Sequence, residues 1–335
     1  MEKVKNIISD LKSVINRKNL ILIFIIVSFS LVFQTINQSY LPLENFTNLL
    51  TQSSVMGILA VGLAFVLLTG GLDLSAGFNV SLSALIGGFV FTQTHNVYLS
   101  ILTCIIIGIV LGFINGFIIV NLKLNSFIVT LATMSLYQGA TSMMGEGRVM
   151  LVVHEVYTFI GKKIIGFIPV SAMIMICVFL FGSIILNNST IGTYISALGS
   201  DEKNARASGI PIGRYRSLAY TILGLCAGIA AVVLIGRISL VTSNSAGNNL
   251  LLDSFACVII GGAKPRGGSV KISGVFLGVL LMTIITNALT MLAITGVAHQ
   301  MFKGLVIIVA LVLNEYGEKM KIKKSFQGSP NQIKS

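Results

Sequence analysis

The 335-residue sequence predicts an all-α polytopic membrane protein with about ten transmembrane helices and with both termini in the cytoplasm. The first observation is composition: 54% of the residues are hydrophobic and 10% are charged, whereas soluble domains carry about 25% charged residues. The second is a series of apolar runs that approach the roughly 20 residues needed to cross a bilayer. The third is the uneven placement of Lys and Arg between those runs.

Short polar or glycine-rich segments separate the apolar runs and set the expected spans one by one. The first run follows a basic stretch, and the third is unusually rich in small and polar residues. The fourth contains several glycines, which let membrane helices pack closely. The eighth ends at Gly261, where a turn containing Gly and Pro begins. The expected spans are residues 20–33, 54–68, 78–93, 99–120, 127–144, 168–186, 218–235, 250–260, 272–292 and 302–313.

These spans divide the chain into three regions. Residues 1–18 carry five Lys and Arg residues, with apolar residues at helical spacing, which predicts a basic amphipathic arm on the inner membrane surface. Residues 19–316 form the transmembrane domain, and residues 317–335 form a polar cytoplasmic tail. Within the domain, residues 145–166 are expected to be a polar loop on the outer side.

The charge distribution supports this topology. With the N-terminus inside and strict alternation, 18 of the 23 Lys and Arg residues fall on the cytoplasmic side and 4 on the outer side. Lys303 lies at the edge of a span. Because Lys and Arg collect in cytoplasmic loops, topology explains the net charge of +12, and no nucleic-acid partner is expected.

The sequence lacks the patterns of common catalytic and energy-coupling sites. It contains no Gly-x4-Gly-Lys-Ser/Thr phosphate loop and no His-Glu-x-x-His zinc motif, and its four cysteines stand singly. No acid/base pair is expected inside an apolar span, because the 11 acidic residues fall in loops, in tails or near span ends. Proton coupling is therefore disfavoured. Neither enzyme activity nor a bound cofactor or metal is expected for this chain.

One polar segment, residues 197–210, interrupts the apolar sequence between two spans. Ser200 is a suitable N-cap, Asp201 and Glu202 fall in the first turn, and Gly209 can close the helix. The segment therefore predicts a short helix exposed to water on the cytoplasmic side. From these residues alone, it is either a simple connector or a contact surface.

Several motifs resemble those of ABC-type sugar permeases, the ribose-type importer family. They include Thr69-Gly-Gly-Leu-Asp-Leu-Ser, Asn115-Gly-Phe, the run at 124–134 and Leu252-Asp-Ser-Phe-Ala-Cys-Val-Ile-Ile-Gly-Gly. The resemblance covers the second to the tenth span. It implies a family role for Gly70, Gly71, Asp73, Ser75, Asp253, Gly261 and Gly262. It also implies that residues 197–210 dock on a separate ATPase through Gly199, Asp201, Glu202, Ala205, Arg206, Ser208, Gly209 and Ile210.

Two questions about polar residues stay open in the sequence. Asp73 either caps the helix that follows it, which is the favoured role, or contacts a ligand. Polar residues within spans either line a hydrophilic path for a hydroxyl-rich solute or join helices through hydrogen bonds. The candidates for such a path are Asn79, Asn115, Gln138 and Asn287.

The resemblance implies the permease subunit of an ATP-driven importer in a bacterial cell membrane. Its expected cargo is a monosaccharide, such as ribose or a related pentose or hexose. The expected partners are a cytoplasmic ATPase that uses ATP and Mg, an extracytoplasmic solute-binding protein, and a second permease copy or paralogue. Alternatives are a nucleoside, branched-chain amino acid or sugar-like signal as cargo, or a secondary transporter or channel that needs no ATPase.

Overall fold

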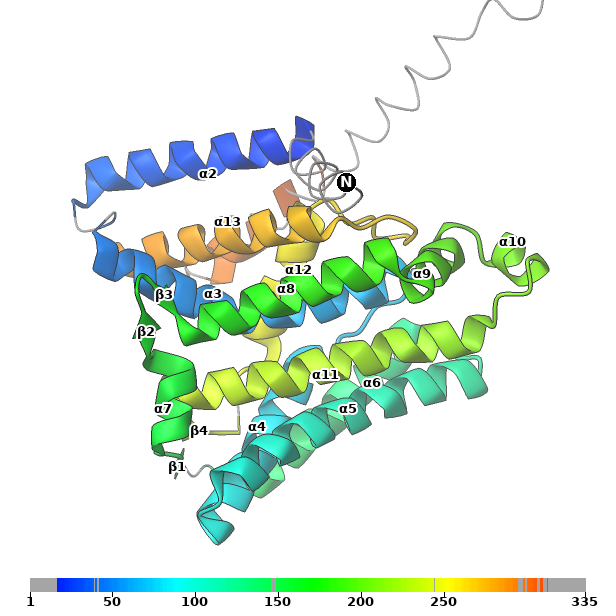
Figure 1. Ribbon diagram of the computed structural model, residues 1–335, viewed down its shortest axis with the longest axis horizontal. Coiled ribbons are helices and arrows are strands. Elements are labelled where there is room, and N and C mark those ends of the chain that lie inside the picture. Colours follow the sequence, from blue (N-terminus) through cyan, green and yellow to red (C-terminus); the bar gives the residue numbers. More distant parts are fainter. Residues whose placement is uncertain are drawn as a thin grey trace, which may run out of the picture.

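The computed structural model describes residues 17–38, 40, 42–145, 147, 149–243, 245–294, 298, 300–305, 308, 309 and 312. Long α-helices that run side by side dominate this part of the chain (Figure 1). Most of the predicted N-terminal arm, the predicted tail at 317–335 and several residues of the tenth expected span lie outside the described residues.

Among the described residues, 7 helices are long and apolar enough to cross a membrane. α6 (Ser126–Gly145) is long but more polar, and α12 (Gly247–Ile260) is apolar but has only 14 residues. The all-α polytopic fold is confirmed, while the count of ten spans and the side of the termini stay predictions. The seven helices are α2 (Arg17–Ile36), α3 (Leu43–Leu68), α4 (Ala76–Thr94), α5 (Val97–Asn121), α8 (Val170–Asn188), α11 (Ile212–Ile238) and α13 (Ile272–Met291).

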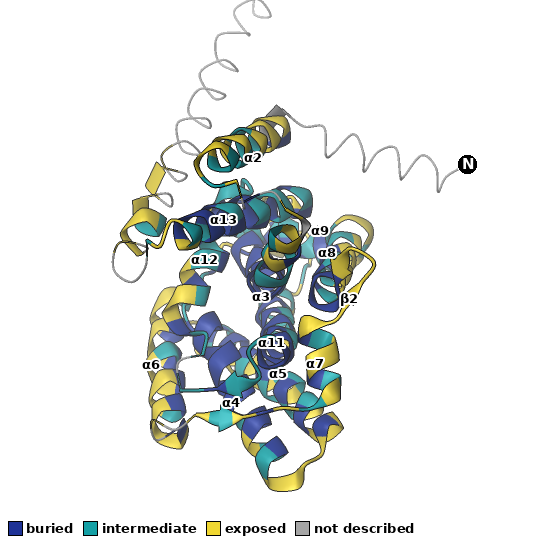
Figure 2. Ribbon diagram, turned by 90° about the vertical axis from the view of Figure 1, so that its left-hand side faces the viewer, coloured by how far each residue is buried: buried dark blue, intermediate teal, exposed yellow. Residues whose placement is uncertain are grey.

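The long helices divide into an inner and an outer set. In α3, α4, α11 and α13, 72–78% of the residues in the most apolar 18-residue stretch are buried. The share is 28% in α5 and α8 and 6% in α2. Figure 2 shows α3 and α11 mostly dark blue and α2 largely yellow and teal. Because lipid tails are as apolar as leucine side chains, the exposed apolar faces of the outer helices suit contact with lipid.

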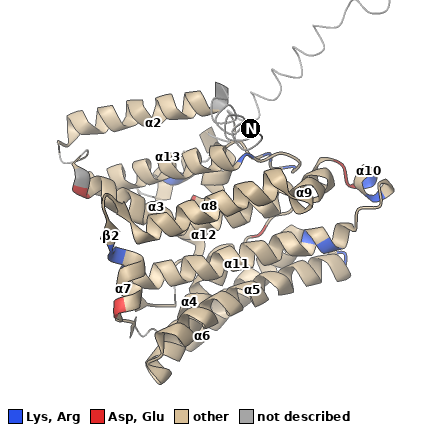
Figure 3. Ribbon diagram, in the orientation of Figure 1, with Lys and Arg blue, Asp and Glu red and all other residues tan. Residues whose placement is uncertain are grey.

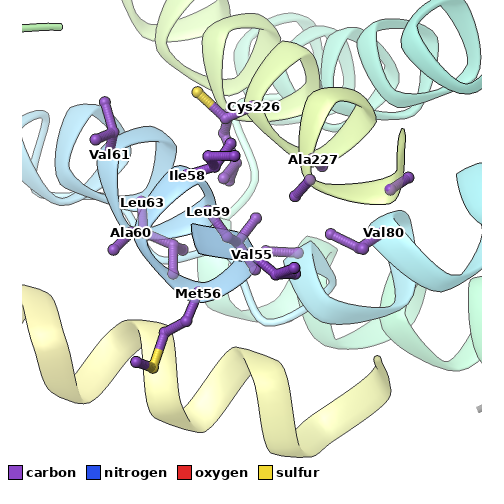
Figure 4. Packing of buried hydrophobic residues seen from close by; sticks show 14 of the residues in the cluster. Val55, Met56, Ile58, Leu59, Ala60, Val61, Leu63, Val80, Cys226 and Ala227 are labelled. Atoms are coloured by element: carbon purple, nitrogen blue, oxygen red, sulfur yellow. The ribbon is translucent and has the colours of Figure 1, made fainter. Parts of the chain in front are cut away.

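The largest hydrophobic core surrounds the middle of α3. Ile58 and Leu59 are fully buried, and they lie in one cluster with Val80 of α4 and with Cys226 and Ala227 of α11 (Figure 4). α3 thus holds the inner helices together.

α3 begins earlier than predicted, at Leu43 rather than at residue 54. Its first turns are polar, but the hydroxyls of Thr47, Ser53 and Ser54 donate to backbone carbonyl oxygens three residues earlier at 2.6–2.8 Å. These bonds satisfy the polar groups within the helix. Hydropathy alone therefore placed the start of this span too late.

α5 and α11 approach each other along a row of glycines. Gly108 and Gly112 of α5 face Gly224 of α11. A Cβ atom added to Gly108 would lie 2.5 Å from the Gly224 carbonyl oxygen, and one added to Gly112 would lie 2.8 Å from the Gly224 Cα. The close packing predicted for small residues is confirmed for this pair of helices.

The segment expected to be a polar loop, residues 145–166, contains regular structure. α7 (Glu155–Lys162) begins at His154, whose Nδ1 accepts a hydrogen bond from the Val156 N–H at 3.2 Å. Two antiparallel strand pairs accompany it: β1 (Met150–Leu151) with β4 (Leu240–Val241), and β2 (Ile164–Ile165) with β3 (Ile168–Pro169). These elements are too short for their periodicity to be read from the sequence.

The two ends of the bundle carry different short elements. α9 (Thr190–Ser200) and α10 (Glu202–Ala207) lie at one end, called the α10 end below, and α7 lies at the other, called the α7 end (Figure 1). Figure 3 shows most Lys and Arg near these two ends, with long uncharged helix bodies between them. This arrangement is typical of helices that cross a bilayer.

Candidate functional site

A short polar helix, α10, projects at the α10 end (Figure 1). Its N-cap is Asp201, whose carboxylate accepts hydrogen bonds from the backbone N–H groups of Lys203 at 2.9 Å and Asn204 at 3.1 Å. The N-cap predicted from the sequence, Ser200, is wrong because Ser200 still belongs to α9. Its hydroxyl donates to the Ser196 carbonyl oxygen at 2.9 Å. The residue with extended backbone between the two helices is Asp201.

The other end of α10 is closed as predicted. Gly209 has a φ of 77°, a conformation that favours glycine. Its N–H donates to the Arg206 carbonyl oxygen at 3.0 Å, and the Ile210 N–H donates to the Ala205 carbonyl oxygen at 3.1 Å. These two bonds form a Schellman motif. α10 is therefore held in shape at both ends by its own residues.

The two faces of α10 differ in their contacts. Glu202 accepts a hydrogen bond from Arg216 of α11 at 2.7 Å and one from Arg206 at 3.2 Å, and Ala205 is buried. The bond from the Arg216 guanidinium holds the pKa of Glu202 below its ordinary value. Lys203 and Arg206 are exposed. Glu202 and Ala205 thus fix α10 to the bundle, and Lys203 and Arg206 present positive charge to solvent, with Arg206 also paired to Glu202.

Three glycine motifs that are far apart in the sequence meet behind α10. The Gly268 N–H donates to the carbonyl oxygen of Leu68, the last residue of α3, at 3.0 Å. A Cβ atom on Gly267 would lie 2.6 Å from the Gly70 backbone nitrogen, and one on Gly199 would collide with the Leu68 carbonyl oxygen. Glycines in all three segments therefore allow the segments to pack backbone against backbone.

Gly261 and Gly262 end α12 in the same way as Gly209 ends α10. Gly262 has a φ of 89°, and its N–H donates to the Ile259 carbonyl oxygen at 2.9 Å. The Ala263 N–H reaches the Val258 carbonyl oxygen at 3.1 Å. This pair of bonds is again a Schellman motif, so this part of the motif shapes a turn.

Asp73 is buried in the turn before α4. Its Oδ1 accepts hydrogen bonds from the backbone N–H and the hydroxyl of Ser75 at 2.8 and 2.6 Å, and its Oδ2 accepts one from Asn115 of α5 at 3.2 Å. The Tyr137 hydroxyl of α6 donates to Asn115 at 3.4 Å. These bonds hold the turn before α4, whose N-cap position is Ser75, and the choice between a cap and a ligand contact for Asp73 stays a prediction. The network joins the turn to α5 and α6.

The four residues proposed to line a path lie in different places. Asn79 donates to the Gly108 carbonyl oxygen at 3.2 Å, and Asn115 belongs to the Asp73 network. Asn287 exchanges hydrogen bonds of 3.0 and 3.1 Å with Asn45, and Gln138 is exposed on α6. Three of the four therefore join helices, and the structure does not bring the four together.

A polar cavity that is not evident from the sequence lies in the half of the bundle toward the α7 end. Its volume is about 330 Å³, and it is bounded by α3, α11, α12, α13 and residue 303. Its lining is divided among five segments of the chain, so no single motif marks it. The polar residues at its wall include Gln52, Arg237, Asn249, Asp253, Thr286 and Lys303.

An ion pair lies in this cavity. The Nζ of Lys303 is 2.7 Å from the Oδ2 of Asp253, and each side chain is only 14% exposed. Asp253 lies in the middle of α12. The expectation that no acid/base pair lies within an apolar span is therefore wrong, because the two partners are 50 residues apart and each alone looks like a residue near a span end.

The described part of the chain is thus an all-α bundle with a capped polar helix at one end and a partly open polar cavity between four of its helices. A family model described as "Branched-chain amino acid transport system / permease component" matches residues 45–311. The chain belongs to this family. Its members are permease subunits, which are transporters and not enzymes, so the chain is a multi-pass permease of the cell membrane.

Sugar permeases are among the relatives of this chain. It is 32% identical to the ribose import permease RbsC of Haemophilus influenzae, over 90% of this chain and 94% of that protein. It is 35% identical to RbsC of Bacillus subtilis, over 85% and 88% of the two chains. It is 30% identical to the L-arabinose permease AraH of Escherichia coli K12, over 80% and 81%. The resemblance to the ribose-type permease family is thereby confirmed.

A solved structure supports the fold independently of sequence. An ABC transporter of metal-chelate type, in an inward-facing conformation, superposes with a TM-score of 0.51 at 15% identity. The match covers 88% of this chain and 97% of that chain. At this low identity the likeness shows a shared fold alone.

Proposed function

We propose that this chain is the transmembrane permease subunit of an ATP-driven ABC importer for a monosaccharide, a ribose-like pentose or a hexose. The observation that carries this proposal is the combination of sugar-permease relatives, matched over most of both chains, with a capped polar helix exposed at one end. The chain itself binds no ATP in this proposal. A separate cytoplasmic ATPase would use ATP and Mg.

The cargo proposal rests on the relatives. The family description mentions branched-chain amino acids, and such an amino acid is the second candidate. The similar proteins described above are named for ribose and arabinose, which favours a monosaccharide. Radiolabelled uptake of D-ribose, L-arabinose and L-leucine by cells that express the complete transporter separates the two candidates.

We assign the remaining partners to the two ends of the bundle. The exposed face of α10, with Lys203 and Arg206, is the proposed contact with the ATPase. The α7 end is the proposed contact with an extracytoplasmic solute-binding protein. A second copy of this chain, or a paralogue, would complete the path at the interface between the two permeases.

The coupling role is tested by reversing charge on the exposed face of α10. We expect Lys203→Glu with Arg206→Glu to abolish ATPase copurification from membranes in mild detergent and to reduce uptake at least tenfold (about 1.4 kcal/mol). Lys123→Glu is the matched control, because Lys123 is also exposed at a turn between helices. Normal copurification and uptake in the double variant would show that α10 is only a connector.

A further inference from the structure

The cavity around the Asp253–Lys303 pair has the size and composition of a small-molecule site. Its volume of about 330 Å³ lies at the lower end of the roughly 300–1,000 Å³ typical of ligand pockets. Val55, Met56 and Leu250 supply apolar surface beside the polar residues. A wall of this mixed kind suits a ring that has both C–H faces and hydroxyl groups.

Several polar groups at the cavity wall are available to a ligand. The side chains of Gln52, Asn249 and Arg237 form no hydrogen bond or ion pair within the described part of the chain. The Thr286 hydroxyl is buried and likewise has no hydrogen-bond partner among the described residues. A buried hydroxyl without a partner is costly, and rotation of the Thr286 side chain toward the cavity would let a solute hydroxyl pair with it.

The charges at the wall offer no partner to the ammonium group of an amino acid. Among the described residues, Asp253 is the only acidic residue at this wall, and its Oδ2 lies 2.7 Å from the Lys303 Nζ. The pair therefore carries no net negative charge, and Arg237 adds a positive charge that can donate hydrogen bonds to solute hydroxyls. The amides of Gln52 and Asn249 and the Thr286 hydroxyl both donate and accept hydrogen bonds, as neutral sugar hydroxyls require.

We infer that this cavity is a binding station for a neutral, polyhydroxylated solute on the transport path, with Thr286 and Asn249 as hydroxyl-binding residues. The inference rests on the proposed function and adds to it the place and the chemistry of solute recognition. The Asp253–Lys303 pair forms the inner wall of the station. Arg237, in the last turn of α11, lies on the side of the α7 end.

The test measures direct binding to the full-length chain in lipid nanodiscs. The probes are D-ribose, L-arabinose and L-leucine, observed by saturation-transfer difference NMR. We expect saturation of the sugar signals and none of leucine. Thr286→Val, which keeps the shape of the side chain, and Asn249→Ala should each weaken sugar binding roughly 3- to 10-fold, the net value of one hydrogen bond.

The control is Thr221→Val in α11, since the Thr221 hydroxyl donates to the Ser217 carbonyl oxygen of its own helix and lies outside the cavity. Sugar binding that is unchanged in both cavity variants would overturn the station. Uptake of the same sugars by the complete wild-type transporter is measured in parallel. If the wild-type transporter takes up sugar but both cavity variants bind sugar normally, the station is wrong and the proposed function stands. Leucine uptake without sugar uptake refutes both the proposed function and the ligand class of the station.

Discussion

Asp253 and Lys303 illustrate what a single buried charge requires in this protein. Removing one partner leaves the other charged, unpaired and mostly buried, since each side chain is 14% exposed. Removing both partners leaves no unpaired charge at this position. Glu202 and Arg206 form the contrasting case, because the Arg206 side chain is 72% exposed. The two pairs therefore make opposite predictions about stability.

We expect Asp253→Ala and Lys303→Ala each to lower the free energy of unfolding by about 3–5 kcal/mol. The double variant should lose much less than the sum of the two. Arg206→Ala, which removes an exposed ion pair, should cost at most about 0.5 kcal/mol. Denaturant unfolding in detergent measures all four. Additive losses at Asp253 and Lys303 would mean that the pair does not exist.

Because Glu202 ionises, we expect the stability of α10 to depend on pH. The hydrogen bond and charge of Arg216 lower the pKa of Glu202 in the folded state. Its contribution to stability is therefore present above the unfolded pKa of about 4.3 and is lost as the pH falls through the lower folded value. We expect amides 202–209 to lose protection from hydrogen exchange at acidic pH, after correction for intrinsic rates.

The matched variant for this measurement is Glu202→Gln, which cannot ionise. In this variant, amides 202–209 should be less protected from hydrogen exchange at pH 7 and should lose no further protection when the pH is lowered. The same acidic step in Glu202→Gln would assign the change to another group.

The pairing of α5 with α11 is a property of two elements. Each glycine in the contact brings the two backbones close enough to exclude even a methyl group, as the 2.8 Å approach at Gly112 shows. Gly139 of α6 is different, because nothing lies within 4 Å of the position of its missing Cβ. A glycine-to-alanine substitution is therefore expected to have opposite effects at Gly112 of α5 and at Gly139 of α6.

We expect Gly112→Ala to destabilise the protein by about 1–3 kcal/mol, since the methyl group forces the helices apart. Gly139→Ala should be neutral or should stabilise by up to about 1 kcal/mol, because alanine favours the helix. Thermal unfolding of the two purified variants compares them directly. Equal effects of both substitutions would contradict the close packing of α5 on α11.

The topology of the whole molecule makes a prediction about labelling from the two sides of the membrane. A cysteine at Lys163, at the α7 end, should react with an impermeant maleimide in intact cells. One at Lys203 should react only after permeabilisation. Cys177 is exposed, whereas Cys104, Cys226 and Cys257 are buried, so Cys177→Ala supplies the background. Reaction of both sites in intact cells would contradict the predicted orientation.

Hydropathy and charge placement predicted the membrane fold because each depends on long runs of residues. Gly209 and Gly262 were also accessible to sequence analysis, since helix ends are set by nearby residues. The N-cap was assigned one residue too early because Ser200 and Asp201 are both good caps, and only the bend between α9 and α10 distinguishes them. The cavity could not be predicted, because Gln52, Asp253 and Lys303 meet only through tertiary packing.

The outermost helix, α2, has a consequence for biosynthesis. Its Leu22, Ile25 and Ile26 pack against Leu281, Ile285 and Leu289 of α13, and Asn19 donates to Ser273 at 3.4 Å. α2 therefore leaves the ribosome some 250 residues before the helix on which it docks. At about 5–20 residues per second, it waits on the order of ten to fifty seconds in the bilayer. During translation, α2 must persist in lipid as a solitary helix, which its almost wholly lipid-compatible surface permits.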